Sequence, residues 1–285
     1  MGKGTFSRSI LQFFGPTCIL RNGSVPTPHD GTARSQLLCL RPVPIGLSIN
    51  RFESNDMKKL MNKVASSLGY DVKKQHLVSR NGFELYRYCK TDGSFDYDKY
   101  RQVQTAGNKR KIKNVWVREE NIAFVSEYIL SKIGDVKFGL CHGTRRGKEQ
   151  EWFGKHLNCE VLGTEISDTA EQFPNTIQWD FHEVKPEWIE SVDFIYSNSF
   201  DHSYDPEKCL QAWMSCIRPG GVCLIEHSSG HEHASELDPF GADISLMPYL
   251  VLTWGKGKFF VRQLLDAPGA KDSLNYIQYL VIQKA

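Results

Sequence analysis

The chain of 285 residues lacks the patterns that mark several protein classes. No apolar run approaches the roughly 18–20 residues that a membrane-spanning helix needs. Its eight cysteines form no Cys-x-x-Cys pair, which argues against zinc ribbons and thioredoxin-type redox sites. The composition, with 40% hydrophobic and 24% charged residues, predicts a globular protein. The length of 285 residues is sufficient for a hydrophobic core that needs no disulfides.

Acidic residues are missing from the first 29 positions, which hold basic residues and several Ser and Thr. Transit peptides have a similar composition, but Pro16, Pro26 and Pro28 interrupt any helix here. We therefore expect residues 1–50 to be a flexible leader and the protein to be cytoplasmic, with import into an organelle as the alternative. Several cysteines lie in apolar runs, which agrees with a reducing compartment.

Charge divides the chain into two parts. Residues 1–115 hold 20 Lys and Arg against 8 Asp and Glu, whereas residues 116–285 hold 15 against 25. The first interpretation is a basic extension, residues 51–115, that docks on an acidic domain, residues 116–285. A site for nucleic acid or another anionic surface is the alternative.

Apolar side chains at spacings of three and four predict three helices, at residues 55–69, 96–104 and 118–133. The second carries Tyr97, Tyr100, Gln102 and Gln104, and we expect this helical extension to act as a lid over a site in the acidic domain. The basic stretch 107–113 is interpreted as a solvated linker, with a nuclear localisation signal or a phosphate-binding patch as the alternatives.

Strands alternate with helices from residue 134 onward. Apolar runs predict strands at 136–141, 160–164, 176–179, 192–196, 222–225, 258–264 and 276–282, with helices at 148–156 and 206–217. This alternation is typical of an α/β fold with a parallel sheet covered on both faces. The last two strands are too close for a crossover helix, so we expect one of them to run antiparallel.

Ligands of such folds bind at the carboxyl ends of the strands, so the residues that follow each strand are candidates for a site. A glycine turn at Gly143 follows the first strand, Glu165 the second and Asp180 the third. An acid 22 residues beyond the glycine turn can accept hydrogen bonds from both hydroxyls of a ribose. Asp180 can accept a hydrogen bond from an adenine amino group. The two acids together indicate a nucleotide-like cofactor.

The segment 116–285 resembles the class I (Rossmann-like) S-adenosylmethionine-dependent methyltransferases. Residues 138–147 are similar to their first motif, residues 200–206 to the motif after strand four, and residues 217–221 to the Pro-Gly-Gly turn before strand five. The resemblance implies a doubly wound, seven-stranded, mostly parallel sheet with an antiparallel C-terminal hairpin, preceded here by the N-terminal helical extension. It also implies S-adenosylmethionine as cofactor and methyl transfer as activity.

The resemblance assigns eight residues to the cofactor: Cys141, Gly143, Thr144, Glu165, Ile166, Asp180, Phe181 and Asn198. The first motif departs from the family pattern, because His142 and the pair Arg145-Arg146 replace small residues. The two arginines are candidates for binding the cofactor carboxylate or a substrate anion.

His202 follows the fourth strand and is the candidate catalytic base if the acceptor is a hydroxyl, with a packing role as the alternative. The acceptor pocket is expected to be lined by Asp201, His227, His231 and His233. The three latter histidines and Asp238 are ligand-type side chains, but their spacing matches no standard motif, so we expect no metal.

The predicted function is methyl transfer to a small or medium-sized polar acceptor. This small-molecule acceptor is the expected partner of the protein, and a nucleic acid is not favoured. One alternative is a methyltransferase-like binding protein without turnover, and another is a nucleic-acid methyltransferase that uses the basic N-terminal part. A nucleotide-dependent oxidoreductase is disfavoured because the Gly-x-Gly-x-x-Gly spacing is missing. The sequence leaves the oligomeric state open.

Overall fold

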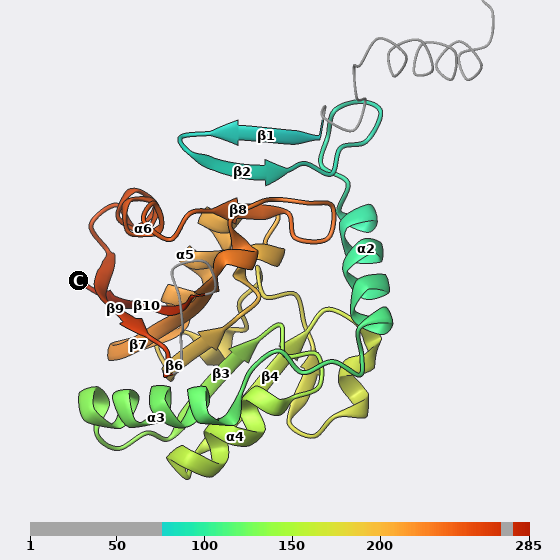
Figure 1. Cartoon of the computed structure of the whole chain (residues 1–285). Helices are drawn as coiled ribbons and strands as arrows, with labels where there is room; N and C mark the ends of the chain where they lie inside the picture. Colours follow the sequence, from blue (N-terminus) through green and yellow to red (C-terminus); the bar gives the residue numbers. More distant parts are fainter. Residues whose placement is uncertain (1–75, 269–275) are drawn as a thin grey trace, which may run out of the picture. The chain divides into compact units, whose positions relative to one another are not determined.

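The computed structural model describes residues 76–268 and 276–285, so the predicted leader and the 55–69 helix lie outside the described residues (Figure 1). Seven strands form one sheet in the order β5-β4-β3-β6-β7-β10-β9. The strands are β3 (Phe138–His142), β4 (Glu160–Glu165), β5 (Thr176–Gln178), β6 (Val192–Ser197), β7 (Ile217–Ser228), β9 (Phe259–Asp266) and β10 (Ile277–Lys284). Neighbouring strands from β5 to β7 pair in parallel, and β10 runs antiparallel to both of its neighbours. The predicted fold class is confirmed.

Helices cover both faces of this sheet. The helices α3 (Glu119–Ile133) and α4 (Lys148–Leu157) pack together on one face, and α5 (Pro206–Cys216) and α6 (Met247–Gly255) pack on the other (Figure 1). The start of α5 follows from its sequence, because Asp205 accepts a hydrogen bond from the Lys208 N–H at 3.1 Å and Pro206 occupies the first turn. The sequence did not predict α6. Within the described ranges, no helix is long and apolar enough to cross a membrane.

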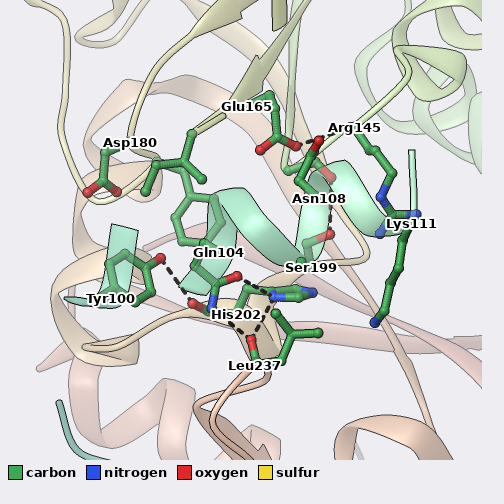
Figure 2. Close-up of a pocket in the computed structure, with 14 residues that line it drawn as sticks. Tyr100, Gln104, Asn108, Lys111, Arg145, Glu165, Asp180, Ser199, His202 and Leu237 are labelled. Carbon is green, nitrogen blue, oxygen red and sulfur yellow. Dashed lines mark hydrogen bonds between the residues drawn. The ribbon is translucent and has the colours of Figure 1, made fainter. Parts of the chain in front are cut away.

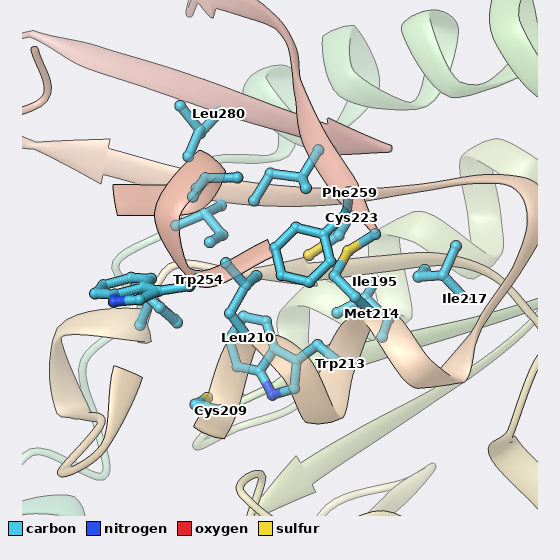
Figure 3. Packing of buried hydrophobic residues seen from close by; sticks show 14 of the residues in the cluster. Ile195, Cys209, Leu210, Trp213, Met214, Ile217, Cys223, Trp254, Phe259 and Leu280 are labelled. Carbon is cyan, nitrogen blue, oxygen red and sulfur yellow. The ribbon is translucent and has the colours of Figure 1, made fainter. Parts of the chain in front are cut away.

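The hydrophobic core has two layers because strand side chains alternate between the faces. In β10, Leu280 packs with Trp213 in the cluster around α5 and α6 (Figure 3). Ile282 belongs to the same cluster, whereas Tyr279 and Val281 pack with the cluster under α3 and α4. The strand β6 is buried over its whole length, as expected for a strand in the middle of a parallel sheet.

A second, three-stranded sheet was not predicted. It consists of β1 (Leu77–Arg80), β2 (Phe83–Tyr86) and β8 (Phe240–Ala242). Asn81-Gly82 forms the turn of the hairpin with φ angles of 52° and 84°, so the Asn-Gly signal of a two-residue hairpin was present in the sequence. The extension is therefore not purely helical, and its hairpin pairs with a strand from the loop that follows β7.

The helix α2 (Tyr97–Arg110) is longer than predicted and includes residues 107–110 of the basic stretch 107–113. The interpretation of that stretch as a linker is therefore wrong for residues 107–110. Gly107 allows this helix to approach the loop after β7, since a Cβ there would lie 2.3 Å from Leu237 Cδ1. Lys109 Nζ forms an ion pair with Asp168 at 2.8 Å. The charge of the extension is thus partly used for docking on the acidic domain.

The close packing of β3 on β6 gives a test of the core. A Cβ at Gly139 would lie 2.2 Å from the ring of buried Phe194, so we expect Gly139→Ala to lower the free energy of unfolding by ~1–3 kcal/mol. Gly154 inside α4 is the matched control, because a Cβ there makes only ordinary contact, at 3.5 Å from Cys159 O. Gly154→Ala should be neutral or stabilising by up to ~1 kcal/mol. Urea unfolding measures both values, and equal stability of the two variants would contradict this description of the sheet.

Candidate active site

The turn after β3 places backbone groups at the point where the strand order reverses, between β3 and β6. Gly143 and Thr144 donate their N–H groups to the Thr164 carbonyl at 2.9 and 3.1 Å. Gly143, Arg145 and Gly147 all have positive φ angles, of 73°, 44° and 73°. Arg145 is a non-glycine residue in this region, which is uncommon and marks a conformation imposed by the surrounding structure.

The carboxylate of Glu165, at the end of β4, is fixed by this turn. Its Oε2 accepts a hydrogen bond from the Arg145 N–H at 3.1 Å, and its Oε1 accepts from the Ser167 N–H at 3.0 Å. Burial raises the pKa of Glu165, and these hydrogen bonds oppose the rise. Each carboxylate oxygen can still accept a further hydrogen bond from a ligand.

Asp180 follows β5 and is held by three protein donors. Its Oδ1 accepts from the backbone N–H and from Nδ1 of His182 at 2.9 and 2.7 Å, and its Oδ2 accepts from the Tyr97 hydroxyl at 2.8 Å. Burial acts to raise the pKa of Asp180, but the hydrogen bonds from His182 and Tyr97 outweigh it and hold the pKa below its usual value. The second lone pair of Oδ2 remains for a ligand.

One face of α2 closes the cavity that lies between these carboxylates (Figure 2). About 530 Å³ of empty space, open solvent at the mouth included, lies in this cavity. From α2 and the residue after it, the wall is formed by Tyr100, Gln104, Gly107, Asn108 and Lys111. Gln102, named with them in the predicted lid, is exposed.

His202 is oriented by two acceptors. Gln104 donates its Nε2 to the Leu237 carbonyl at 2.7 Å, which places Oε1 of Gln104 at 2.8 Å from His202 Nδ1. The Leu237 carbonyl itself lies 3.0 Å from the same nitrogen. Both neighbours accept hydrogen bonds, so Nδ1 carries a proton, and in the neutral form of the ring the lone pair is on Nε2. This Nε2 lies 3.7 Å from Asp238 Oδ1.

A second cavity of about 1110 Å³, with its open solvent, continues from the first, and Gly143, Arg145, Ser199 and His202 line both. Four carboxylates line it: Glu149, Asp201, Glu226 and Asp238. Four cationic side chains also line it: Lys111, Arg145, Arg146 and Lys148. The first three carboxylate residues are buried. This cavity therefore combines both signs of charge beside the first one.

Two departures from the family's first motif have internal roles. His142 is buried against the Trp213 ring, with 4.8 Å between the ring centroids, and burial lowers its pKa to about 3, so it is a neutral core residue. Arg145 and Arg146 donate to the backbone carbonyls of residues 114 and 113, at 3.4 and 3.0 Å. The arginine pair therefore fastens the segment that follows α2 to the glycine turn.

The structure gathers most of the predicted site residues. The first cavity is lined by Gly143, Glu165, Ile166, Asp180, Phe181 and His202. The second is lined by Thr144, Asn198, Asp201 and His231, together with Gly143 and His202. Three predicted residues line neither: Cys141 and His227 are buried behind the cavities, and the His233 side chain is 82% exposed beside Glu84.

Some participants were missed. His182, which orients Asp180, has a signal in the Asp-x-His spacing. Glu149 lies in the first turn of α4, where acidic residues are common, so nothing in the sequence distinguishes it as a site residue. Asp201 and Asp238 lie near one another although 37 positions separate them.

Comparisons with known proteins agree with this fold. Residues 140–225 match the family described as methyltransferase domain. The 1,6-didemethyltoxoflavin-N1-methyltransferase of Burkholderia thailandensis aligns over 74% of this chain and 100% of its own, with 14% identity and a TM-score of 0.52. The CcbJ methyltransferase of Streptomyces caelestis aligns over 64% and 99%, with 12% identity and a TM-score of 0.45. No curated protein matches the sequence. At these identities the structural likeness concerns the fold.

The buried acid of α4 generates a pH prediction. Burial raises the pKa of Glu149 from 4.5 to about 8. The folded state therefore keeps a proton that the unfolded chain loses above pH 4.5, so the stability that the neutral Glu149 contributes is complete below pH 4.5 and is lost as the pH rises through 8. Gln resembles the neutral acid, so Glu149→Gln should gain stability relative to wild type between pH 5 and pH 9, on the order of 1–3 kcal/mol.

Urea unfolding at the two pH values measures this gain. Exposed Glu151 in the same helix provides the control, and Glu151→Gln should show no such gain. If both variants follow wild type at pH 5 and at pH 9, Glu149 does not titrate in this way.

Proposed function

We propose that this chain, which belongs to the class I S-adenosylmethionine-dependent methyltransferases, binds its cofactor in the first cavity and methylates a small or medium-sized polar acceptor in the second. One observation carries the proposal. The Glu165 and Asp180 carboxylates end adjacent strands, are each fixed by protein donors, and line a single cavity beside the glycine turn. The order of these groups along the sheet suits ribose and adenine.

Unpartnered polar atoms in the cavities fit such a ligand. Asn108 Nδ2, Arg145 Nε and Thr144 Oγ1 are buried and have no hydrogen-bond partner among the described residues. Buried polar groups nearly always have a partner, so a bound molecule with many polar groups would satisfy them.

Gly143 has little space around it, since a Cβ there would lie 2.6 Å from Ser199 Cβ.

Each part of the cofactor has a candidate partner in the chain. Glu165 would accept from the ribose hydroxyls and Asp180 Oδ2 from the adenine amino group, with Ile166 and Phe181 beside the ring. Thr144 and Asn198 lie toward the second cavity, where the methionine part would reach. When bound, S-adenosylmethionine supplies a methyl group on a sulfonium, which needs no further activation.

The chain's own residues then hold and deprotonate the acceptor. His202 lines both cavities and presents the lone pair of Nε2, so it is the group placed to take a proton from an acceptor hydroxyl. Asp201 and His231 would hydrogen-bond the acceptor from the wall of the second cavity. α2 acts as the lid and limits the water that reaches the site.

A small acceptor fits the enclosure. The second cavity is bounded by the residues after α2, the glycine turn, the segment after β6 and the loop after β7. The Burkholderia methyltransferase of similar fold is described with 1,6-didemethyltoxoflavin bound, which is a small molecule. In the basic N-terminal part, which could attract a nucleic acid, Lys109 is paired with Asp168 at 2.8 Å. A small acceptor is therefore favoured over a nucleic acid.

Cofactor binding tests the proposal. Isothermal titration with S-adenosylmethionine and S-adenosylhomocysteine should show one site per chain. Glu165→Ala removes an acceptor for two hydroxyls, and each hydrogen bond to a charged group contributes ~1.5–3 kcal/mol, so the dissociation constant should rise at least ~10-fold. Asp180→Ala should also weaken binding by at least ~10-fold.

Glu171→Ala is the matched control, because Glu171 is an exposed acid in the turn after β4. It should keep the wild-type dissociation constant, and circular dichroism verifies the folding of all three variants. Tight binding by Glu165→Ala would contradict the cofactor site, and no binding by folded wild type would contradict the proposed function.

A further inference from the structure

We propose that Asp201, His202 and Asp238 form a binding site for a divalent metal ion of the Mg²⁺ and Mn²⁺ class at the edge of the second cavity. The ion's use in methyl transfer rests on the proposed function, whereas its binding does not. The three residues come from two segments, η4 (Phe200–His202) and the loop after β7. One ligand atom from each residue lies within 4.8 Å of the other two.

The distances suit an ion better than direct contacts. His202 Nε2 and Asp238 Oδ1 are 3.7 Å apart, which is too long for a hydrogen bond. Two donors that bind one cation at 2.0–2.2 Å lie roughly 3–4.4 Å apart, depending on the angle between them. The three groups would therefore need to move together by less than about 1 Å to coordinate an ion.

Asp201 is the independent observation that a ligand is needed. The residue is only 8% exposed, and its Oδ1 is buried with no hydrogen-bond partner among residues 76–268 and 276–285. Its Oδ2 lies 3.9 Å from His231 Nε2, which is also beyond hydrogen-bond distance. A buried carboxylate oxygen without a partner is costly, and a cation at this position would compensate it.

The other two ligands are already oriented. His202 is hydrogen-bonded through Nδ1 to Gln104 and Leu237, the arrangement by which a metal-binding imidazole is usually held, so Nε2 is presented. Asp238 accepts from the Ser235 hydroxyl through Oδ2 at 3.1 Å, which leaves Oδ1 on the side of His202. These contacts reduce the entropy that ion binding would cost.

The donor set indicates the type of ion. Two carboxylates neutralise a double positive charge, and carboxylate oxygens suit Mg²⁺ and Mn²⁺. Mn²⁺ also tolerates an imidazole ligand, so it is the better probe. Three protein ligands leave further positions for water and for an oxygen of the acceptor. From the sequence, only His227, His231 and His233 with Asp238 were weighed as metal ligands, and no metal was predicted. Asp201 and His202 were not considered together with Asp238.

The proposal changes the role of His202. One nitrogen cannot bind an ion and accept a proton at the same time, so with the ion bound, Nε2 is a ligand and His202 is not the base. A metal lowers the pKa of a coordinated oxygen, so an acceptor hydroxyl could then lose its proton to water. Loss of activity in His202→Ala would fit either role, and only metal binding separates them.

The decisive experiment is titration of the purified full-length chain with MnCl₂ after EDTA treatment and dialysis, followed by electron paramagnetic resonance of the free ion. Wild type should bind one Mn²⁺ per chain. Asp201→Asn and Asp238→Asn keep the size of the side chain and remove its charge, and each should raise the dissociation constant at least 10-fold. Mn²⁺ should raise the melting temperature of wild type more than that of either variant.

Glu236→Gln is the matched control, because Glu236 lies in the same loop, two residues from Asp238, and outside the cluster. It should keep the wild-type affinity for Mn²⁺. Absence of Mn²⁺ binding, or binding that both Asp→Asn variants retain, would overturn the metal site. Titration of the same samples with S-adenosylhomocysteine separates the two proposals: cofactor binding without Mn²⁺ binding overturns only the metal site, and Mn²⁺ binding without cofactor binding overturns only the proposed function.

Discussion

Parallel pairing of β3 with β4 and β6 is the constraint on which the rest of the site depends. Since parallel strands end at the same edge, their first free residues meet there without any further folding instruction. The register places Cys141 opposite Gly163 and Tyr196, so Gly143, Glu165 and Asn198 follow at nearly the same height. A shift by one residue would turn these groups to the other face of the sheet. The polar turn after β3 is thus held by an apolar sheet.

The second determinant comes from outside the sheet. α2 contacts both halves of the site, because Tyr97 binds Asp180 at one end of the helix and Gln104 orients His202 near its middle. Gly107 permits the close approach to Leu237 that keeps these contacts in register. The extension therefore contributes to the proposed active site, and the groups predicted for cofactor and acceptor share one supporting helix.

The sequence predicted the large sheet well because its strands are short apolar runs that end in chemically distinct residues. Glu165 and Asp180 could be found from their places after strands. The hairpin around Asn81-Gly82 was missed although its turn signal is strong, since its partner β8 is only three residues long. Contacts such as Tyr97 with Asp180, or Asp201 with Asp238, depend on how separate segments pack, which no local pattern encodes. His233 was misplaced for the same reason.

The pairing of β2 with β8 also has a consequence for how the protein is made. Phe83 pairs with Ala242 and Leu85 with Phe240, so more than 150 residues separate the partners. A nascent chain exposes the hairpin long before its third strand leaves the ribosome, and contacts of such separation form late because loop closure must come first. The loop that carries Leu237 and Asp238 is anchored by this pairing. The acceptor side of the proposed site is therefore completed only after the strands β3, β4 and β5, which carry the proposed cofactor side, have emerged.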